Sequence, residues 1–261
     1  MNSSFFTNDI SQKLRNKKEV SVAWAQLGSN VSSEILAEAG FDVLLIDMEH
    51  SPTDLPSVLS MMQATKGTGC VPFVRAPWND MVAIKQILDL GAYGIHIPYV
   101  STKEEAEHAV KACKYAPLGF RGIAGSQRAV QYGMKKSQYY KKANEDIIVI
   151  VAIETPEGVA NINEIAAVDG VDGIFIGPAD LSTAMGYLAN PSAPEVQKAI
   201  TTIEEAVLST NKFLGTVAPT MDHAKKLYKK GYSFICLMSD AGALSKLASE
   251  TAQAFKKEYR E

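Results

Sequence analysis

The chain has 261 residues, of which 46% are hydrophobic and 21% charged, and its formal net charge at pH 7 is −3. This length fits one large α/β barrel as well as two smaller domains, and the apolar fraction is sufficient for a sizeable core. A mildly acidic chain has no electrostatic attraction for nucleic acid or anionic membranes, so we expect neither as a partner. No apolar stretch has the length needed to cross a bilayer.

The three cysteines, Cys70, Cys113 and Cys236, are odd in number and have no metal-ligand spacing. We therefore expect reduced, mostly buried thiols, as in a cytoplasmic protein. The first twenty residues are polar and charged, which is unlike a secretory signal peptide.

Strand-like and helix-like segments alternate along the chain with short connections. The predicted strands are 20–27, 43–49, 70–75, 94–100, 147–154, 173–176, 213–217 and 234–238. The predicted helices are 32–39, 54–66, 80–90, 102–114, 158–168, 194–209, 221–230 and a C-terminal helix over 241–258. Eight strand–helix units without a linker predict a single (β/α)8 TIM barrel spanning residues 1–261.

One connection, over residues 116–146, is far longer than the others. It contains four glycines and the lysine pairs 135–136 and 141–142. A loop of this length in a compact domain is usually functional or takes part in assembly. We interpret its lysines as a solvated face, because the net charge of the chain argues against a nucleic-acid role.

Two apolar segments each lead directly to a carboxylate. Residues 147–153 run into Glu154, and residues 173–176 are followed by Gly177, Pro178 and, after Ala179, Asp180. Continuously apolar strands are covered on both faces, which favours a parallel sheet. Burying a lone carboxylate is costly, so Glu154 needs a cation, hydrogen bonds or a position at the rim. The two acids either share a divalent metal or cap the helices that follow them.

Further charged residues follow other predicted strands. Asp47, Glu49 and His50 come at the end of the second strand, and Arg75 at the end of the third. In a barrel these strand ends lie together, so one base candidate, one cation and a carboxylate pair predict an active site.

Residues that are missing narrow the chemistry. No predicted strand carries a lysine in its core, which argues against Schiff-base catalysis. His108 and His223 fall in predicted helices, which argues against a zinc site of several histidines. Two carboxylates suit Mg²⁺, Mn²⁺ or Co²⁺, and such an ion can chelate a 2-keto acid and stabilise its enolate.

Five segments in order carry a family resemblance: Asp47–Pro52, Val74–Asp80, Ala116–Gly122, Ile153–Thr155 and Ile176–Ser182. They resemble the HpcH/HpaI aldolase family, and the resemblance extends from about residue 22 to residue 240. It implies a metal-dependent class II pyruvate aldolase, similar to 2,4-dihydroxyhept-2-ene-1,7-dioate aldolase. Such enzymes reversibly cleave 4-hydroxy-2-keto acids to pyruvate and an aldehyde.

The resemblance also implies roles for individual residues. Glu154 and Asp180 would bind the metal, His50 would be the base, and Arg75 would stabilise the enolate and carbonyl oxygen. Asp89 matches an acid that raises the basicity of that histidine. Asp47 matches a second acid near it.

Substrate contacts and assembly are implied as well. Arg75, Gly177, Pro178, Ala179 and Asp180 would contact the keto acid, with the backbone at Ala179 touching the pyruvate part. Members of the family are commonly hexamers that exchange C-terminal helices between subunits.

Two departures from the family pattern bear on the substrate. The family often has a glutamine two residues before the metal-binding glutamate, where this chain has Ala152, and Leu237-Met238 replace the usual Val-Gly. Two other functions stay open. One is a related 2-keto-acid decarboxylase or an acyl-CoA lyase, although no cationic nucleotide site is evident, and the other is a non-catalytic binding barrel.

Overall fold

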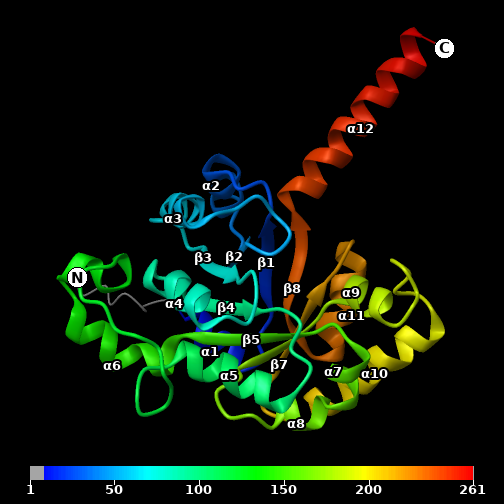
Figure 1. Cartoon of the computed structure of the whole chain (residues 1–261). Coiled ribbons are helices and arrows are strands. Elements are labelled where there is room, and N and C mark those ends of the chain that lie inside the picture. Colours follow the sequence, from blue (N-terminus) through cyan, green and yellow to red (C-terminus); the bar gives the residue numbers. More distant parts are fainter. Residues whose placement is uncertain (1–8, 261) are drawn as a thin grey trace.

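Eight parallel strands pair in chain order, and the eighth pairs with the first, in the computed structural model of residues 9–260 (Figure 1). The predicted single (β/α)8 barrel is therefore confirmed. The strands are β1 (Val20–Ala25), β2 (Val43–Asp47), β3 (Val71–Arg75), β4 (Gly94–Ile97), β5 (Ile148–Ile153), β6 (Gly173–Ile176), β7 (Phe213–Val217) and β8 (Tyr232–Ser239).

Helices surround this barrel on its outside. They are α1 (Ile10–Arg15), α2 (Asn30–Glu38), α3 (Leu55–Ala64), α4 (Met81–Asp89), α5 (Lys103–Cys113), α6 (Lys136–Asp146), α7 (Pro156–Ala160), α8 (Ile162–Ala166), α9 (Pro178–Ala184), α10 (Pro194–Leu208) and α11 (Met221–Lys230). A short 3₁₀ helix, η1 (Arg128–Gly133), precedes α6, and α12 (Asp240–Tyr259) ends the chain.

Aromatic rings fill the inside of the barrel. Phe73, Phe175, Phe213 and Phe234 are at most 1% exposed and contact one another in ring pairs. Gly173 makes room for the ring of Phe213, because a Cβ on this glycine would lie 2.2 Å from it. The barrel is therefore a packed core, and a small-molecule site has to lie at one of its ends.

The long connection is largely helical, which the sequence analysis did not predict. Residues 128–133 form η1 and residues 136–146 form α6. The segment is strongly polar, but Tyr139 and Ala143, one helical turn apart, are buried, and the hydroxyl of Tyr139 accepts a hydrogen bond from Arg121 at 3.1 Å. Tertiary contact rather than an apolar pattern therefore stabilises this helix.

Two other boundaries differ from the prediction. The fifth helix is broken at Asn161 into α7 and α8, and the amide of Asn161 donates a hydrogen bond to the carbonyl of Ser101. Residues 178–184 form the short helix α9, so Asp180 lies in the first turn of a helix rather than in a loop.

Helix α12 leaves the barrel and projects away from it (Figure 1). It has 20 residues, of which only Asp240 is buried. The carboxylate of Asp240 fixes the start of the helix by accepting hydrogen bonds from the backbone N–H of Gln26, at 2.7 Å, and the hydroxyl of Ser32, at 2.8 Å.

The three cysteines are free and buried, as expected. In the part of the chain that the structure describes, no helix has the length and apolar character needed to cross a membrane.

Candidate active site

The C-terminal ends of the strands form the mouth of the barrel, and a buried ion pair lies at its base. Asp47, the last residue of β2, is paired with Arg75, the last residue of β3. The guanidinium of Arg75 donates two hydrogen bonds to Asp47, from Nε to Oδ1 at 2.9 Å and from Nη2 to Oδ2 at 2.7 Å. It also lies over the ring of Trp24, 4.5 Å from the centroid. Arg75 is thereby held in one orientation beneath the mouth.

Asp47 also organises the loop that follows β2. Its Oδ1 accepts the backbone N–H groups of Glu49 and His50, at 3.0 and 3.3 Å, and its Oδ2 accepts the amide of Gln26. Burial alone would raise the pKa of Asp47, but the hydrogen bonds and charge of Arg75 outweigh it and hold that pKa below its ordinary value. This carboxylate stays ionised.

Glu154 lies just beyond the end of β5 and is only 2% exposed. Its Oε2 accepts the backbone N–H of Tyr99 at 2.9 Å. Its Oε1 fills the place where a side chain at Gly177 would begin, because a Cβ there would lie 2.4 Å away. Burial, followed by the charges of Glu49 and Asp180, raises the pKa of Glu154 to about 7.

A third acid, Glu49, shares this environment. Its Oε2 lies 2.9 Å from Nη1 of Arg75. Burial raises the pKa of Glu49 to about 7, and the charges of Asp47 and Asp180 add to this effect while Arg75 opposes it. Three mutually repelling carboxylates, Glu49, Glu154 and Asp180, therefore face the mouth with one arginine among them.

This donor set fits a divalent cation. A hard cation would relieve the repulsion that adds to the effect of burial on both pKa values, and carboxylate oxygens are its preferred ligands. Within residues 9–260, no group of three or more histidine, cysteine or acidic side chains is arranged as a ready metal site. A metal site formed by Glu154 and Asp180 stays a prediction.

His50 and Asp89, which the sequence analysis placed together, lie apart in this chain. The side chain of His50 is 56% exposed, and its Nε2 is 3.7 Å from Oε1 of Glu49. Asp89 ends α4 and forms an ion pair with Arg121 at 2.9 Å. A helix that follows a strand runs back to the opposite end of the barrel, so Asp89 cannot reach His50 of its own subunit.

The sequence analysis assigned no role to two aromatic residues at the mouth, although Trp78 lies in a segment that carries the family resemblance. Tyr99 has a left-handed backbone, with φ of 54°, and its ring stacks on Trp78 at 5.9 Å. Tyr and Trp are common in cores and surfaces alike, so only the fold places them beside Glu154.

Ala152 and His96 lie inside the barrel below the mouth. Ala152 is fully buried in the interior cluster, on the same face of β5 as Ile148 and Ile150. His96 is also fully buried, and neither ring nitrogen has a hydrogen-bond partner among the described residues. Burial lowers the pKa of His96 to about 3, with a smaller contribution from Arg75, so it is neutral and is not the base.

A (β/α)8 barrel with charged side chains gathered at the C-terminal ends of its strands is the arrangement of a barrel enzyme. Residues 21–246 match the family described as HpcH/HpaI aldolase/citrate lyase. The chain belongs to this family.

Several relatives are similar over nearly their whole length. The 5-keto-4-deoxy-D-glucarate aldolase of Escherichia coli is 40% identical over 257 residues, which cover 98% of this chain and all of that one. A family member from Burkholderia cenocepacia of known structure is 34% identical, with a TM-score of 0.91 over 96% of this chain and 100% of its own. An HpcH/HpaI aldolase from Desulfitobacterium hafniense is 28% identical, with a TM-score of 0.86 over 95% and 96%. The chain is a class II aldolase and therefore a carbon–carbon lyase.

We predict that the metal-free protein loses stability as the pH rises from about 5 to about 8. Glu49 and Glu154 have pKa values of about 7 when folded, against about 4.3 for an unperturbed glutamate. Between these values the folded protein holds protons that the unfolded chain has released, so stability falls as pH rises. A divalent cation needs the ionised carboxylates, and it should raise the melting temperature more at about pH 8 than at about pH 5.5.

The matched variant is Glu154→Gln, which keeps the shape of the side chain and cannot ionise. Its melting temperature should depend less on pH and respond less to the cation than that of the wild type. The prediction is wrong if the two proteins have the same pH profile in thermal melts.

Proposed function

We propose that this aldolase cleaves a 4-hydroxy-2-keto diacid of the 5-keto-4-deoxy-D-glucarate type, reversibly, to pyruvate and a hydroxylated aldehyde. The observation that carries the substrate class is the 40% identity to the Escherichia coli enzyme of that name, which extends over the full length of both chains. The acids and arginine at the mouth support it, because they suit a reaction that passes through an enolate.

Glu154 and Asp180 are the residues that would hold the divalent cation, with Mg²⁺, Mn²⁺ and Co²⁺ as the candidates. When bound, the cation supplies Lewis-acid chemistry, polarising the keto group and stabilising negative charge on its oxygen. Glu154 is well suited to this role because its side chain is held in place by the N–H of Tyr99 and by the close backbone of Gly177.

Side chains of the protein accept the hydroxyl proton of the substrate and neutralise the charge of the enolate. His50, exposed at the mouth, accepts the proton of the C4 hydroxyl, directly or through a water. The C3–C4 bonding electrons then pass toward the keto carbonyl, the aldehyde leaves, and the enolate of pyruvate remains. Arg75 lies where it can neutralise this enolate, and protonation at C3 completes the cleavage. The backbone from Gly177 through Pro178 to Ala179 lines the keto-acid end.

The first test is metal-dependent aldol chemistry. We expect the purified protein to cleave 5-keto-4-deoxy-D-glucarate to pyruvate, to lose this activity with a chelator, and to regain it with Mg²⁺, Mn²⁺ or Co²⁺. Gly177→Ala should abolish reactivation, because the new methyl group displaces the carboxylate of Glu154. Gly69→Ala is the control, since nothing lies within 4 Å of a Cβ there.

Two outcomes would contradict this assignment. One is full activity after metal removal. The other is a borohydride-trapped pyruvate adduct on a lysine, which would mean Schiff-base chemistry.

A second prediction concerns the base. His50→Ala should lower kcat by roughly 10²–10⁴-fold, the usual contribution of a general base. The fold should be retained, because the side chain is exposed. His223→Ala, on the outer face of α11, should be indistinguishable from the wild type. Near-full activity of His50→Ala across the pH range would place the base elsewhere.

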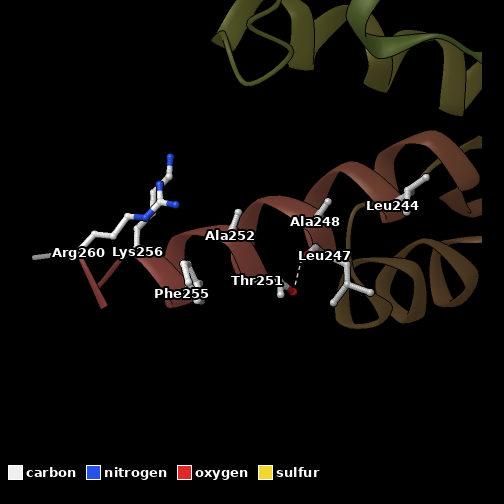
Figure 2. Close-up of a pocket in the computed structure, with 8 residues that line it drawn as sticks. All are labelled: Leu244, Leu247, Ala248, Thr251, Ala252, Phe255, Lys256 and Arg260. Atoms are coloured by element: carbon white, nitrogen blue, oxygen red, sulfur yellow. Dashed lines mark hydrogen bonds between the residues drawn. The ribbon is translucent and has the colours of Figure 1, made fainter. Parts of the chain in front are cut away.

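We also propose a homo-oligomer, with a hexamer as the expected size. Helix α12 exposes large apolar side chains along one stripe, among them Leu244, Leu247 and Phe255 (Figure 2). The hollow beside them is lined by α12 alone. A long helix with an uncovered apolar stripe needs a partner surface, and a second copy of this chain supplies one.

The surroundings of Asp89 support an interface as well. The segment after α5 exposes Leu118, Phe120 and Ile123 near the Arg121–Asp89 pair. The side chain of Asp89 remains 19% exposed. If Asp89 does support His50, as the family pattern implies, it must do so across subunits.

The assembly is tested by light scattering and by mixing variants. The wild type should have six times the mass of the 28.2 kDa chain, and the double variant Leu247→Asp, Phe255→Asp should be smaller. His50→Ala and Asp89→Asn, each weakly active alone, should regain activity when co-assembled, because one subunit then supplies the histidine and its neighbour the aspartate. Absence of recovery in a verified mixed oligomer would remove Asp89 from the site.

We place the enzyme in the cytoplasm, a reducing compartment in which three free, buried cysteines are expected.

A further inference from the structure

Tyr99 occupies a special position at the mouth. It follows the end of β4, and its backbone N–H donates the hydrogen bond that holds Oε2 of Glu154, at 2.9 Å. To do so it adopts a left-handed conformation, with φ of 54°. Such a conformation is unfavourable for a residue with a bulky side chain and persists where the surrounding structure imposes it. The strain therefore fixes both a metal-ligand candidate and the direction of the tyrosine ring.

The ring of Tyr99 is only partly buried and forms an aromatic shelf with Trp78. The two rings stack with centroids 5.9 Å apart and planes at 30°, and Trp78 is 56% exposed. Trp78 follows β3 just after Arg75, so the shelf stands on the same strand ends as the catalytic groups. It is a rigid, amphipathic surface beside the acids, open to solvent on its outer side.

The phenol of Tyr99 lies close enough to the acids of the mouth for their charges to act on it. Burial raises the pKa of Tyr99, and the charges of Asp180, Glu154 and Glu49 raise it further. A phenol is protonated at neutral pH, so the hydroxyl is available as a hydrogen-bond donor. No hydrogen bond to another described side chain engages it.

The proposed reaction leaves one part of the substrate without a recognised partner. The cation site and the backbone of residues 177–179 take the keto-acid end, and Arg75 takes the enolate oxygen. The aldehyde end, which carries hydroxyl and carboxylate groups in the proposed substrate, has to extend outward from the metal site. The shelf borders the acids and combines an apolar face with a polar donor.

We propose that Tyr99 is a specificity-determining residue that selects hydroxylated aldehydes, with its ring and that of Trp78 covering the aldehyde carbons and its hydroxyl donating to the aldehyde's α-hydroxyl group. This inference rests on the proposed aldolase function and deepens it by naming the electrophile class. It assigns no role to the tyrosine in bond cleavage, which His50 and Arg75 carry out.

The experiment compares two aldehydes of equal size in aldol addition to pyruvate. Glycolaldehyde and propanal have the same number of heavy atoms and differ by a hydroxyl in place of a methyl group. A neutral hydrogen bond contributes about 0.5–1.5 kcal/mol, which corresponds to roughly 2- to 13-fold in kcat/KM. Tyr99→Phe should lose this factor with glycolaldehyde and stay within about twofold of the wild type with propanal.

Tyr99→Phe is a clean variant because it keeps the ring, the stacking on Trp78 and the backbone N–H that binds Glu154. The KM for pyruvate and the increase in melting temperature on adding Mn²⁺ should therefore be unchanged. Tyr187→Phe, which removes the phenol hydroxyl of a half-buried tyrosine on the loop after α9, is the matched control. Trp78→Ala removes the apolar cover and should weaken both aldehydes together.

The outcomes separate this inference from the proposed function. If the wild type condenses neither aldehyde with pyruvate and cleaves no keto acid, the proposed function fails. If the wild type is active and Tyr99→Phe changes both aldehydes equally, or neither, Tyr99 does not select the hydroxyl group and the inference is wrong.

Discussion

The buried ion pair between Asp47 and Arg75 is the interaction on which the site depends. Both side chains are at most 5% exposed, so each charge is taken out of water and is tolerable only with its partner. Removing one partner of such a pair typically costs about 3–5 kcal/mol, because the other charge is left uncompensated. The same carboxylate accepts the N–H groups of Glu49 and His50. Asp47, which holds Arg75 in place, therefore also positions His50, the proposed base.

Around this ion pair, the carboxylates at the mouth repel one another. Glu49 and Glu154 have pKa values near 7 because they are buried close to each other and to Asp180. An arrangement that repels itself in this way lowers the stability of the metal-free protein, but it creates a strong attraction for a cation. The shelf of Trp78 and Tyr99 borders the same region. The strained backbone of Tyr99 donates the hydrogen bond to Glu154, so the strain and the charge repulsion meet at one carboxylate.

Much of the fold could be read from the sequence, because buried parallel strands are short apolar runs and their ends are marked by charged residues or glycine. The strands ending at Asp47 and Arg75 were placed correctly for this reason. Helix α6 could not be recognised, since its stability comes from two buried side chains in a polar segment. The projection of α12 was also hidden, because an amphipathic pattern does not say which surface covers it.

For the site, local motifs identified the residues but not their relations in space. Glu154 and Arg75 follow strands, so the topology of a barrel brings them together. Asp89 is the last residue of a helix and lies at the other end of the barrel, a relation that a motif match does not contain. Tyr99 was missed because its importance comes from a backbone conformation and a hydrogen bond, neither of which has a signature in a tyrosine.

Hydrogen bonds connect the start of α12 to the buried ion pair of the mouth. Asp240 is bonded to the backbone of Gln26, and the side chain of Gln26 in turn donates to Asp47, at 3.2 Å. Gln26, in the loop after β1, thus joins the start of α12 to the carboxylate that holds Arg75. A substitution at Asp240 or Gln26 is therefore expected to disturb the carboxylate of Asp47 as well as the start of α12.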